Sequence, residues 1–293
     1  MATGSRAVRR LCGVAASGVG LLVTASACSV DDAFHLGWPR DSVTPQAQRM
    51  FDLWIGSVVA AFAVGALVWG LIFWCVLAYR KRGGELPAQT RYNLPIEIVY
   101  SVTPFLVISV LFYYTAIIQT DVNRVSDNPD VVVNVEAFKW NWKFEYPGTN
   151  GPDGQPVYTI GTSDYVPVLV LPTNKRIQFN LKARDVIHSF WVPRMLFKRD
   201  VFPGNIADNN RFQTTIVSTG HFVGRCAELC GAYHSMMLFE VRAVTPENYE
   251  RFLAEKAKGA TTPAALTAIG EDPLATTTSP FETKRDADAG LPR

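Results

Sequence analysis

The sequence predicts a two-span α-helical transmembrane hairpin followed by an all-β barrel or sandwich. Two long apolar runs lie before residue 120, and from residue 129 onwards short alternating or apolar runs replace the helical pattern. Composition decides little, because 293 residues with 48% hydrophobic and 18% charged side chains suit either a globular or a membrane protein. A formal net charge of +2 with no long basic run argues against binding to nucleic acid.

The N-terminus has the layout of a secretory signal. Three arginines in the first ten positions precede a weakly apolar run over 11–27 that ends in small residues. The triplet Ala25-Ser26-Ala27 directly before Cys28 also resembles a bacterial lipobox. We therefore expect export and a lipidated mature N-terminus at Cys28, with an ordinary signal peptide or a retained anchor as the alternatives.

Two apolar runs predict the membrane hairpin. Residues 53–79 carry no charged side chain. A helix rises about 1.5 Å per residue, so ~20 residues cross a bilayer, and this run is longer than that. The second run, 99–118, is about the minimum length. The segment between them has four basic residues against one acidic residue, and such short basic loops stay in the cytoplasm. We predict a multi-pass protein of the bacterial cell membrane whose two termini and β-domain face the periplasm or cell exterior.

Glu97 follows Pro95 at the cytoplasmic start of the second span. Proline suits the first turn of a helix, and a carboxylate there costs far less than one at the bilayer centre. The residues alone leave two roles open for Glu97. It could favour the positive end of the helix dipole, or it could form the entrance of a proton path.

Short segments with the pattern of strands follow the hairpin, at a spacing typical of a β-sandwich or barrel. They cover 131–137, 139–146, 166–171, 176–183, 189–192, 212–216, 220–225 and 237–243, and 147–154 has the composition of a loop. Thr245 and Pro246 suit the start of a helix. The predicted parts are a signal at 1–27, an exported segment at 28–50, spans at 51–80 and 96–119 joined by a loop at 81–95, a β-domain at 129–245, a helix at 246–258 and a disordered tail at 259–293.

Two thiols, a carboxylate, an imidazole and two thioethers lie in one short stretch, Cys226-Ala-Glu-Leu-Cys-Gly-Ala-Tyr-His-Ser-Met-Met237. In an exported domain the two cysteines could form a disulfide. Zinc accepts two cysteines and two histidines but gains little from methionine. Soft thiolates with an imidazole and a thioether favour copper, which the stretch therefore predicts.

A further strong ligand must come from another part of the chain. The candidates are His35, His188 and His221. His35 precedes the first span and is poorly placed. His188 lies at a predicted strand edge in the β-domain, with Asp185 three residues earlier as a possible hydrogen-bond partner of the imidazole. We therefore expect His188 to join the metal site.

These residues resemble a known family. The stretch 226–237, the segment Asp185-Val-Ile-His-Ser-Phe190 and the aromatic segment Lys139-Trp-Asn-Trp-Lys-Phe-Glu-Tyr146 look like subunit II of the haem-copper cytochrome c oxidases, of the bacterial, actinobacterial type. The resemblance covers residues from about 50 to 256 and includes the hairpin. It implies a cupredoxin-like β-barrel that holds a dinuclear copper centre, CuA.

The resemblance also assigns roles by motif position. It makes Trp140 the surface aromatic through which an electron enters from cytochrome c, although Asn141 stands at a position that is often aromatic. It makes Glu97 the mouth of a proton channel into subunit I. It assigns the Glu228 side chain to a magnesium or manganese ion at the junction with subunit I, and Met236 to no metal. The implied copper ligands are Cys226 and Cys230 as bridges, His188 and His234 on one copper each, and Met237 and the Glu228 carbonyl as weak ligands.

The implied partners are subunits I and III of the oxidase, where haem a and then the oxygen site receive the electrons and oxygen becomes water with proton translocation. No C-x-x-C-H motif is present, so the electron donor is another polypeptide. Acidic and basic residues nearly balance in the β-domain, and this count neither supports nor excludes an acidic face that would steer a basic soluble cytochrome. The donor is thus cytochrome c or a membrane-tethered c-type cytochrome, such as one in a cytochrome bc supercomplex.

Other functions fit less well. A quinol oxidase subunit typically lacks these copper ligands, and a nitrous oxide reductase needs a large catalytic domain. The remaining alternative is a stand-alone membrane-anchored copper-binding or copper-delivery protein, which would not need Glu97 or Trp140.

Overall fold

The structure is a computed structural model that describes residues 38, 42–80, 83–84 and 89–280. The predicted signal at 1–27, the candidate lipidation site Cys28, and His35 lie outside the described residues.

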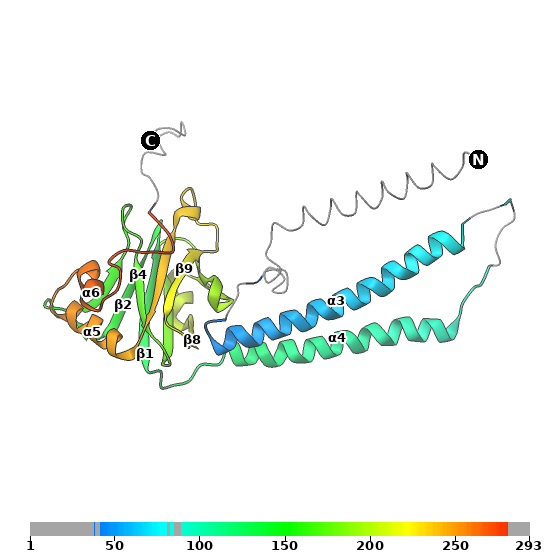
Figure 1. Cartoon of the computed structure of the whole chain (residues 1–293), viewed down its shortest axis with the longest axis horizontal. Helices are drawn as coiled ribbons and strands as arrows, with labels where there is room; N and C mark the ends of the chain where they lie inside the picture. The colour runs from blue at the N-terminus through cyan, green and yellow to red at the C-terminus, as the bar shows by residue number, and fades with distance from the viewer. Residues whose placement is uncertain (1–37, 39–41, 81–82, 85–88, 281–293) are drawn as a thin grey trace, which may run out of the picture. The chain divides into compact units, whose positions relative to one another are not determined.

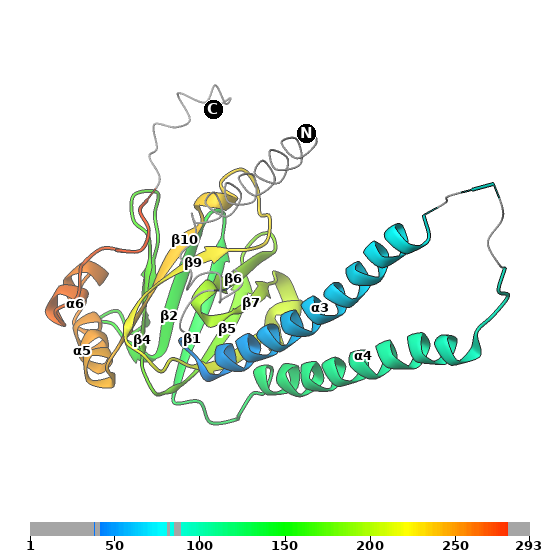
Figure 2. The ribbon, with the colours of Figure 1, turned by 45° about the vertical axis from the view of Figure 1, so that its right-hand side comes forward.

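Two long helices correspond to the predicted spans, α3 (Pro45–Ala78) and α4 (Leu94–Val122). The Thr44 hydroxyl accepts a hydrogen bond from the Ala47 N–H at 3.0 Å, which caps α3. Both helices are long and apolar enough to cross a membrane, and the most apolar stretch of each is unburied within the structure. Figures 1 and 2 show them as the two arms of a hairpin. At about 1.5 Å per residue, each exceeds a hydrocarbon core of about 30 Å.

The β-domain consists of two mixed five-stranded sheets, visible in Figures 1 and 2. The first sheet has the strand order β3-β2-β1-β5-β8, and β1 and β5 run parallel. The second has the order β4-β10-β9-β6-β7, and β4 and β10 run parallel. The strands are β1 (Val131–Phe138), β2 (Asn141–Asn150), β3 (Pro156–Ile160), β4 (Val168–Pro172), β5 (Arg176–Ala183), β6 (His188–Val192), β7 (Phe197–Val201), β8 (Arg211–Thr215), β9 (Gly220–Cys226) and β10 (Leu238–Val244).

Aromatic side chains from both sheets meet in the core. Trp142 on β2 packs edge-to-face on Phe239 of β10, with 5.2 Å between ring centroids. Phe179 on β5 packs against Phe190 on β6 at 5.6 Å. All four rings are buried. Burial of such large apolar rings stabilises the domain. The two sheets therefore form a sandwich, as the strand pattern predicts.

Two strands and one loop differ from the sequence-based expectation. Strand β3 has the strand-favouring sequence Pro-Val-Tyr-Thr-Ile, but it is short and follows a segment rich in Gly and Pro, and the sequence analysis did not assign it. Strand β7 has the charged sequence Phe-Lys-Arg-Asp-Val, which lacks an apolar strand pattern. The predicted loop 147–154 is wrong over 147–150, which continue β2. There the register with β3 shifts between Tyr146 and Asn150, and such an irregularity lets a strand pass through turn-like residues.

The predicted disordered tail is wrong as far as residue 277. After helix α5 (Pro246–Ala257) the chain forms a second short helix, α6 (Thr262–Ala268). Ala265, Leu266 and Ile269 are buried and belong to the hydrophobic core of the domain. The composition suggested mobility because large apolar residues are few, but those few share one helical face. We call residues 259–277 the C-terminal strap.

The strap covers a buried ion pair on β10. Glu240 and Arg242 are both fully buried and hydrogen-bonded to each other. The Glu240 carboxylate also accepts the backbone N–H groups of Thr276 at 2.7 Å and Thr277 at 2.8 Å. The Arg242 guanidinium donates to the Leu274 carbonyl at 2.9 Å. Buried charges need such partners, so the strap provides groups without which the pair would be only partly satisfied.

Candidate metal centre

Strand pairing brings the predicted ligands together. Cys226 ends β9 and His188 begins β6, and these strands are neighbours with Phe190 opposite Cys226. The loop that follows Cys226 returns to β10, and the Cys226 N–H donates to the Met237 carbonyl at 3.0 Å, which closes the loop at its base. His188 and the loop are far apart in the sequence, but the pairing of β6 with β9 places them close together in space.

Cys226 and Cys230 are free thiols that lie side by side. Their Sγ atoms are 3.9 Å apart, about twice the ~2.05 Å length of a disulfide. Both cysteines are buried. The two sulfurs are therefore not bonded to each other in the structure, and a shared metal ion about 2.3 Å from each of them can span their separation.

Each thiol has one imidazole and one weaker donor beside it. The His188 Nδ1 is 3.9 Å from the Cys226 Sγ, and that sulfur lies 3.3 Å from the Glu228 carbonyl oxygen. The His234 Nδ1 is 3.5 Å from the Cys230 Sγ, and the Met237 Sδ is 3.8 Å from that sulfur. The donors thus fall into two matched sets around a central pair of sulfurs.

Asp185 fixes the orientation of His188. Its Oδ1 lies 2.8 Å from the His188 Nε2, while its Oδ2 accepts the Lys139 N–H at 2.7 Å. A carboxylate on one ring nitrogen turns the other toward a metal and raises its basicity. The hydrogen bond that the sequence predicts between Asp185 and His188 is confirmed.

Burial and hydrogen bonding give the two thiols different acidities. Burial opposes ionisation of Cys226, but hydrogen bonds from His188 and its other neighbours outweigh burial and lower the pKa of this thiol. Burial and the adjacent Cys226 sulfur raise the pKa of Cys230. Burial acts against the charged form of His188, yet Cys226 and Asp185 raise the pKa of its imidazole. Without metal, the site favours one thiolate held beside an imidazole.

The donor set fits copper better than zinc. Potential ligand atoms that all lie within 4.8 Å of one another belong to His188, Cys226 and Cys230, and this group does not include His234. A structural zinc ion needs four strong donors around one point. Thiolates, imidazoles and a thioether split between two sulfurs instead suit a pair of copper ions.

Trp140 lies against the candidate metal-binding loop, which joins β9 to β10. It occupies the two-residue turn between β1 and β2, and its indole N–H donates to the Cys230 carbonyl at 3.2 Å. Its ring packs edge-to-face on Tyr233, with 4.9 Å between centroids. Tyr233 and the neighbouring Gly231 were not singled out by the sequence reasoning. Their contact with Trp140 spans about 90 residues of chain, and no local pattern reveals it.

Glu97 lies apart from this site, in the first turn of α4. Its carboxylate accepts the Asn93 N–H at 2.8 Å, and the Asn93 side chain accepts the Ile96 N–H at 3.4 Å. This reciprocal pattern resembles a capping box. Glu97 thus stabilises the helix start, which is compatible with either predicted role.

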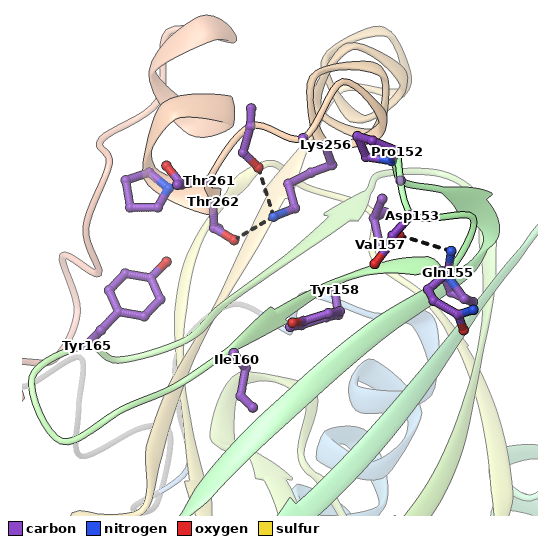
Figure 3. A pocket seen from close by; sticks show the side chains of 15 residues that line it. Pro152, Asp153, Gln155, Val157, Tyr158, Ile160, Tyr165, Lys256, Thr261 and Thr262 are labelled. Atoms are coloured by element: carbon purple, nitrogen blue, oxygen red, sulfur yellow. Dashed lines mark hydrogen bonds between the residues drawn. The ribbon is translucent and has the colours of Figure 1, made fainter.

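A separate cavity of about 540 Å³ lies between β3 and the strap (Figure 3). The Lys256 side chain reaches into it and donates to the Ala260 carbonyl at 3.1 Å and to the Thr262 hydroxyl at 3.3 Å. None of the candidate metal ligands lines it. These contacts link α5 to α6, so Lys256 acts in holding the strap.

Comparison with known proteins gives consistent matches. The family model of the periplasmic domain of cytochrome c oxidase subunit II matches residues 131–244. Cytochrome c oxidase subunit 2 of Mycobacterium tuberculosis (strain ATCC 25618 / H37Rv) is 43% identical over 339 residues, covering 98% of this chain and 93% of the relative. The probable subunit 2 of Nocardia farcinica is 45% identical over 347 residues, covering 96% and 92%.

A solved structure is also similar, the periplasmic domain of subunit II of cytochrome oxidase from Bradyrhizobium japonicum. It is 26% identical with a TM-score of 0.38, and the match covers 44% of this chain and 95% of that domain. The sequence relatives decide the family, since they are more than 40% identical over nearly the whole length of both chains. This chain belongs to the cytochrome c oxidase subunit 2 family.

Proposed function

We propose that this oxidase subunit holds a dinuclear copper centre, CuA, between β6 and the loop that joins β9 to β10. The observation that carries the proposal is the pairing of donors, one imidazole and one weaker donor beside each thiol sulfur. When bound, the copper pair supplies a centre that exchanges one electron at a time. Its ligands are Cys226, Cys230, His188, His234, Met237 and the Glu228 carbonyl.

The chain's own residues prepare this site. Burial of both cysteines, His188 and Met237 excludes water, and Asp185 holds the His188 ring in one orientation. Trp140 is the aromatic through which the electron enters, because its indole contacts the backbone of a copper ligand. The subunit accepts electrons from cytochrome c and delivers them to haem a in subunit I, where oxygen is reduced to water with proton translocation.

The partners follow from this role. We propose contacts with subunits I and III and, as donor, cytochrome c or a membrane-tethered c-type cytochrome in a cytochrome bc supercomplex. The Glu228 side chain is exposed, so its carboxylate is free to bind a magnesium or manganese ion at the junction with subunit I. Cys28 remains a proposed lipidation site.

Copper loading of the full chain tests the proposal. We expect a purple protein whose EPR spectrum shows one unpaired electron shared by two coppers. Met237→Leu should alter this spectrum, because the buried Met237 thioether lies 3.8 Å from the Cys230 sulfur. Met236→Leu is the matched control and should leave the spectrum unchanged. A single type 1 copper, or uptake of zinc alone, would rule out CuA.

We also propose that Glu97 forms the mouth of a proton channel into subunit I. Glu97→Gln keeps an oxygen that can accept the Asn93 N–H, so the helix start should survive. In the assembled oxidase we expect slower turnover with an unchanged copper spectrum. Turnover equal to that of the native enzyme would leave Glu97 with its capping role only.

A further inference from the structure

The indole of Trp140 rests in a seat formed by three residues of the metal-binding loop, Cys230, Gly231 and Tyr233. The Cys230 carbonyl accepts the indole N–H at 3.2 Å. The Tyr233 ring meets the indole at an interplanar angle of 73°, with 4.9 Å between centroids. Such edge-to-face pairs are favourable beyond their buried area. Both aromatic residues are half-buried, so the seat lies at the domain surface.

Gly231 leaves room for the indole. A Cβ atom at this position would lie 3.2 Å from both the Nε1 and the Cζ2 of Trp140. The backbone of Gly231 also has φ +121°, which side chains other than glycine rarely adopt. The indole of Trp140 therefore contacts the loop at two places, the backbone of Gly231 and the ring of Tyr233.

Asn141 does not contribute to the seat. Its side-chain amide donates to the Thr162 carbonyl at 3.0 Å, and its Oδ1 accepts the Trp142 N–H at 2.9 Å. A Cβ atom at Gly161 would collide with this side chain, so Asn141 is packed against the neighbouring loop. The residue beside Trp140 in the chain thus provides no ring, and the ring comes from Tyr233 instead.

We propose that Tyr233 is a positioning residue that fixes the indole of Trp140 against the Cys230 carbonyl for electron uptake. The inference rests on the proposed function of Trp140 and goes beyond it by naming the group that sets its geometry. The contact with Trp140 is made by the ring of Tyr233, so phenylalanine keeps this contact and leucine does not.

The test compares Tyr233→Leu with Tyr233→Phe in the full chain and in the assembled oxidase. Tyr158→Leu is the control, since Tyr158 is a 45% exposed aromatic on β3 outside the metal site. Fluorine NMR of the metal-free full chain, labelled with 5-fluorotryptophan, reports the environment of the Trp140 indole once Trp140→Phe has identified its signal. Stopped-flow measurements give the rate of electron uptake from reduced cytochrome c, and redox titration gives the potential of the copper centre.

We expect Tyr233→Leu to shift or broaden the Trp140 signal and to slow electron uptake by about 2- to 10-fold, the equilibrium factor of an edge-to-face pair. Tyr233→Phe and Tyr158→Leu should match the native protein, and the reduction potential should not change. An unchanged signal and rate in Tyr233→Leu would overturn the inference. A shifted potential would overturn it too, because Tyr233 would then act on the copper ligands.

Trp140→Phe separates this inference from the proposed function. If that variant takes up electrons at the native rate, the assigned role of Trp140 fails, whatever Tyr233 does. If Trp140→Phe is slow and Tyr233→Leu is not, only the positioning role of Tyr233 fails.

Discussion

Two cysteines only four residues apart have opposite shifts in acidity. Cys226 lies at the end of a strand beside His188, whereas Cys230 lies in the loop with the Cys226 sulfur as its neighbour. Ionisation of one thiol makes ionisation of the second harder, since like charges in a buried site repel. The two thiols thus differ in acidity because their contacts differ, and this difference can be measured in the metal-free protein.

In the metal-free full chain we expect Cys226 to be alkylated at lower pH than Cys230. The thiolate is the reactive form, so the lowered pKa of Cys226 moves its reaction to lower pH and the raised pKa of Cys230 moves its reaction to higher pH. Brief exposure to iodoacetamide across a pH series, followed by mass-spectrometric peptide mapping, measures both profiles. His188→Gln should shift the Cys226 profile to higher pH, and prior labelling of Cys230 would contradict this assignment.

At the scale of elements, strand β10 has an alternating sequence that predicts one solvated face, but tertiary contacts bury that face. Glu240 and Arg242 alternate with apolar residues, as on a strand with one solvated face. In the structure that face lies under the C-terminal strap, and both charges are fully buried. Strands with an apolar alternation were predictable for the same reason that β10 was, whereas the charged strand β7 is identified only by its pairing with β6.

Arg242→Met should destabilise the domain by about 3–5 kcal/mol, because it leaves the Glu240 carboxylate buried without its cation. Lys258→Met is the matched control. The Lys258 side chain is 67% exposed in its pair with Glu255, so its loss should cost no more than about 1 kcal/mol. Denaturant titration of the full chain in detergent, followed by near-ultraviolet circular dichroism, gives both free energies. Similar losses in the two variants would show that the buried pair is not structurally important.

The same ion pair predicts acid sensitivity of the strap. Burial alone would raise the pKa of Glu240, but the Thr277 N–H and Arg242 outweigh burial and lower it. The stabilisation is therefore complete above the ordinary pKa of glutamate and is lost as the pH falls through the lower pKa of the folded state. Arg242→Met should remove part of this pH dependence.

At the scale of the whole molecule, the basic loop between the spans sets the proposed orientation. A thiol placed in the loop by Gly84→Cys should react with a membrane-impermeant maleimide only after cells are permeabilised. Ser218→Cys, in the exposed turn between β8 and β9, should react in intact cells. The native chain corrects for labelling of its own cysteines. The reverse labelling pattern would show that the β-domain faces the cytoplasm.

The sequence by itself determined the hairpin and the all-β class, and it contains the candidate donors of the proposed metal site. Charge-free length, strand alternation and the spacing of Cys226, Cys230, His234 and Met237 are local properties, and they can be read without coordinates. The two helices and the β-sandwich confirm the hairpin and the all-β class.

Only the tertiary structure decided which distant groups meet. It joined Asp185 to Lys139 and seated Trp140 on the Cys230 carbonyl. It also folded the strap over Glu240 and Arg242. Each contact links segments tens of residues apart, and strand order, which no local pattern encodes, brings them together. The strap is also a case in which local composition did not predict the structure. Its few apolar residues order a mainly polar segment because they pack against the β-domain.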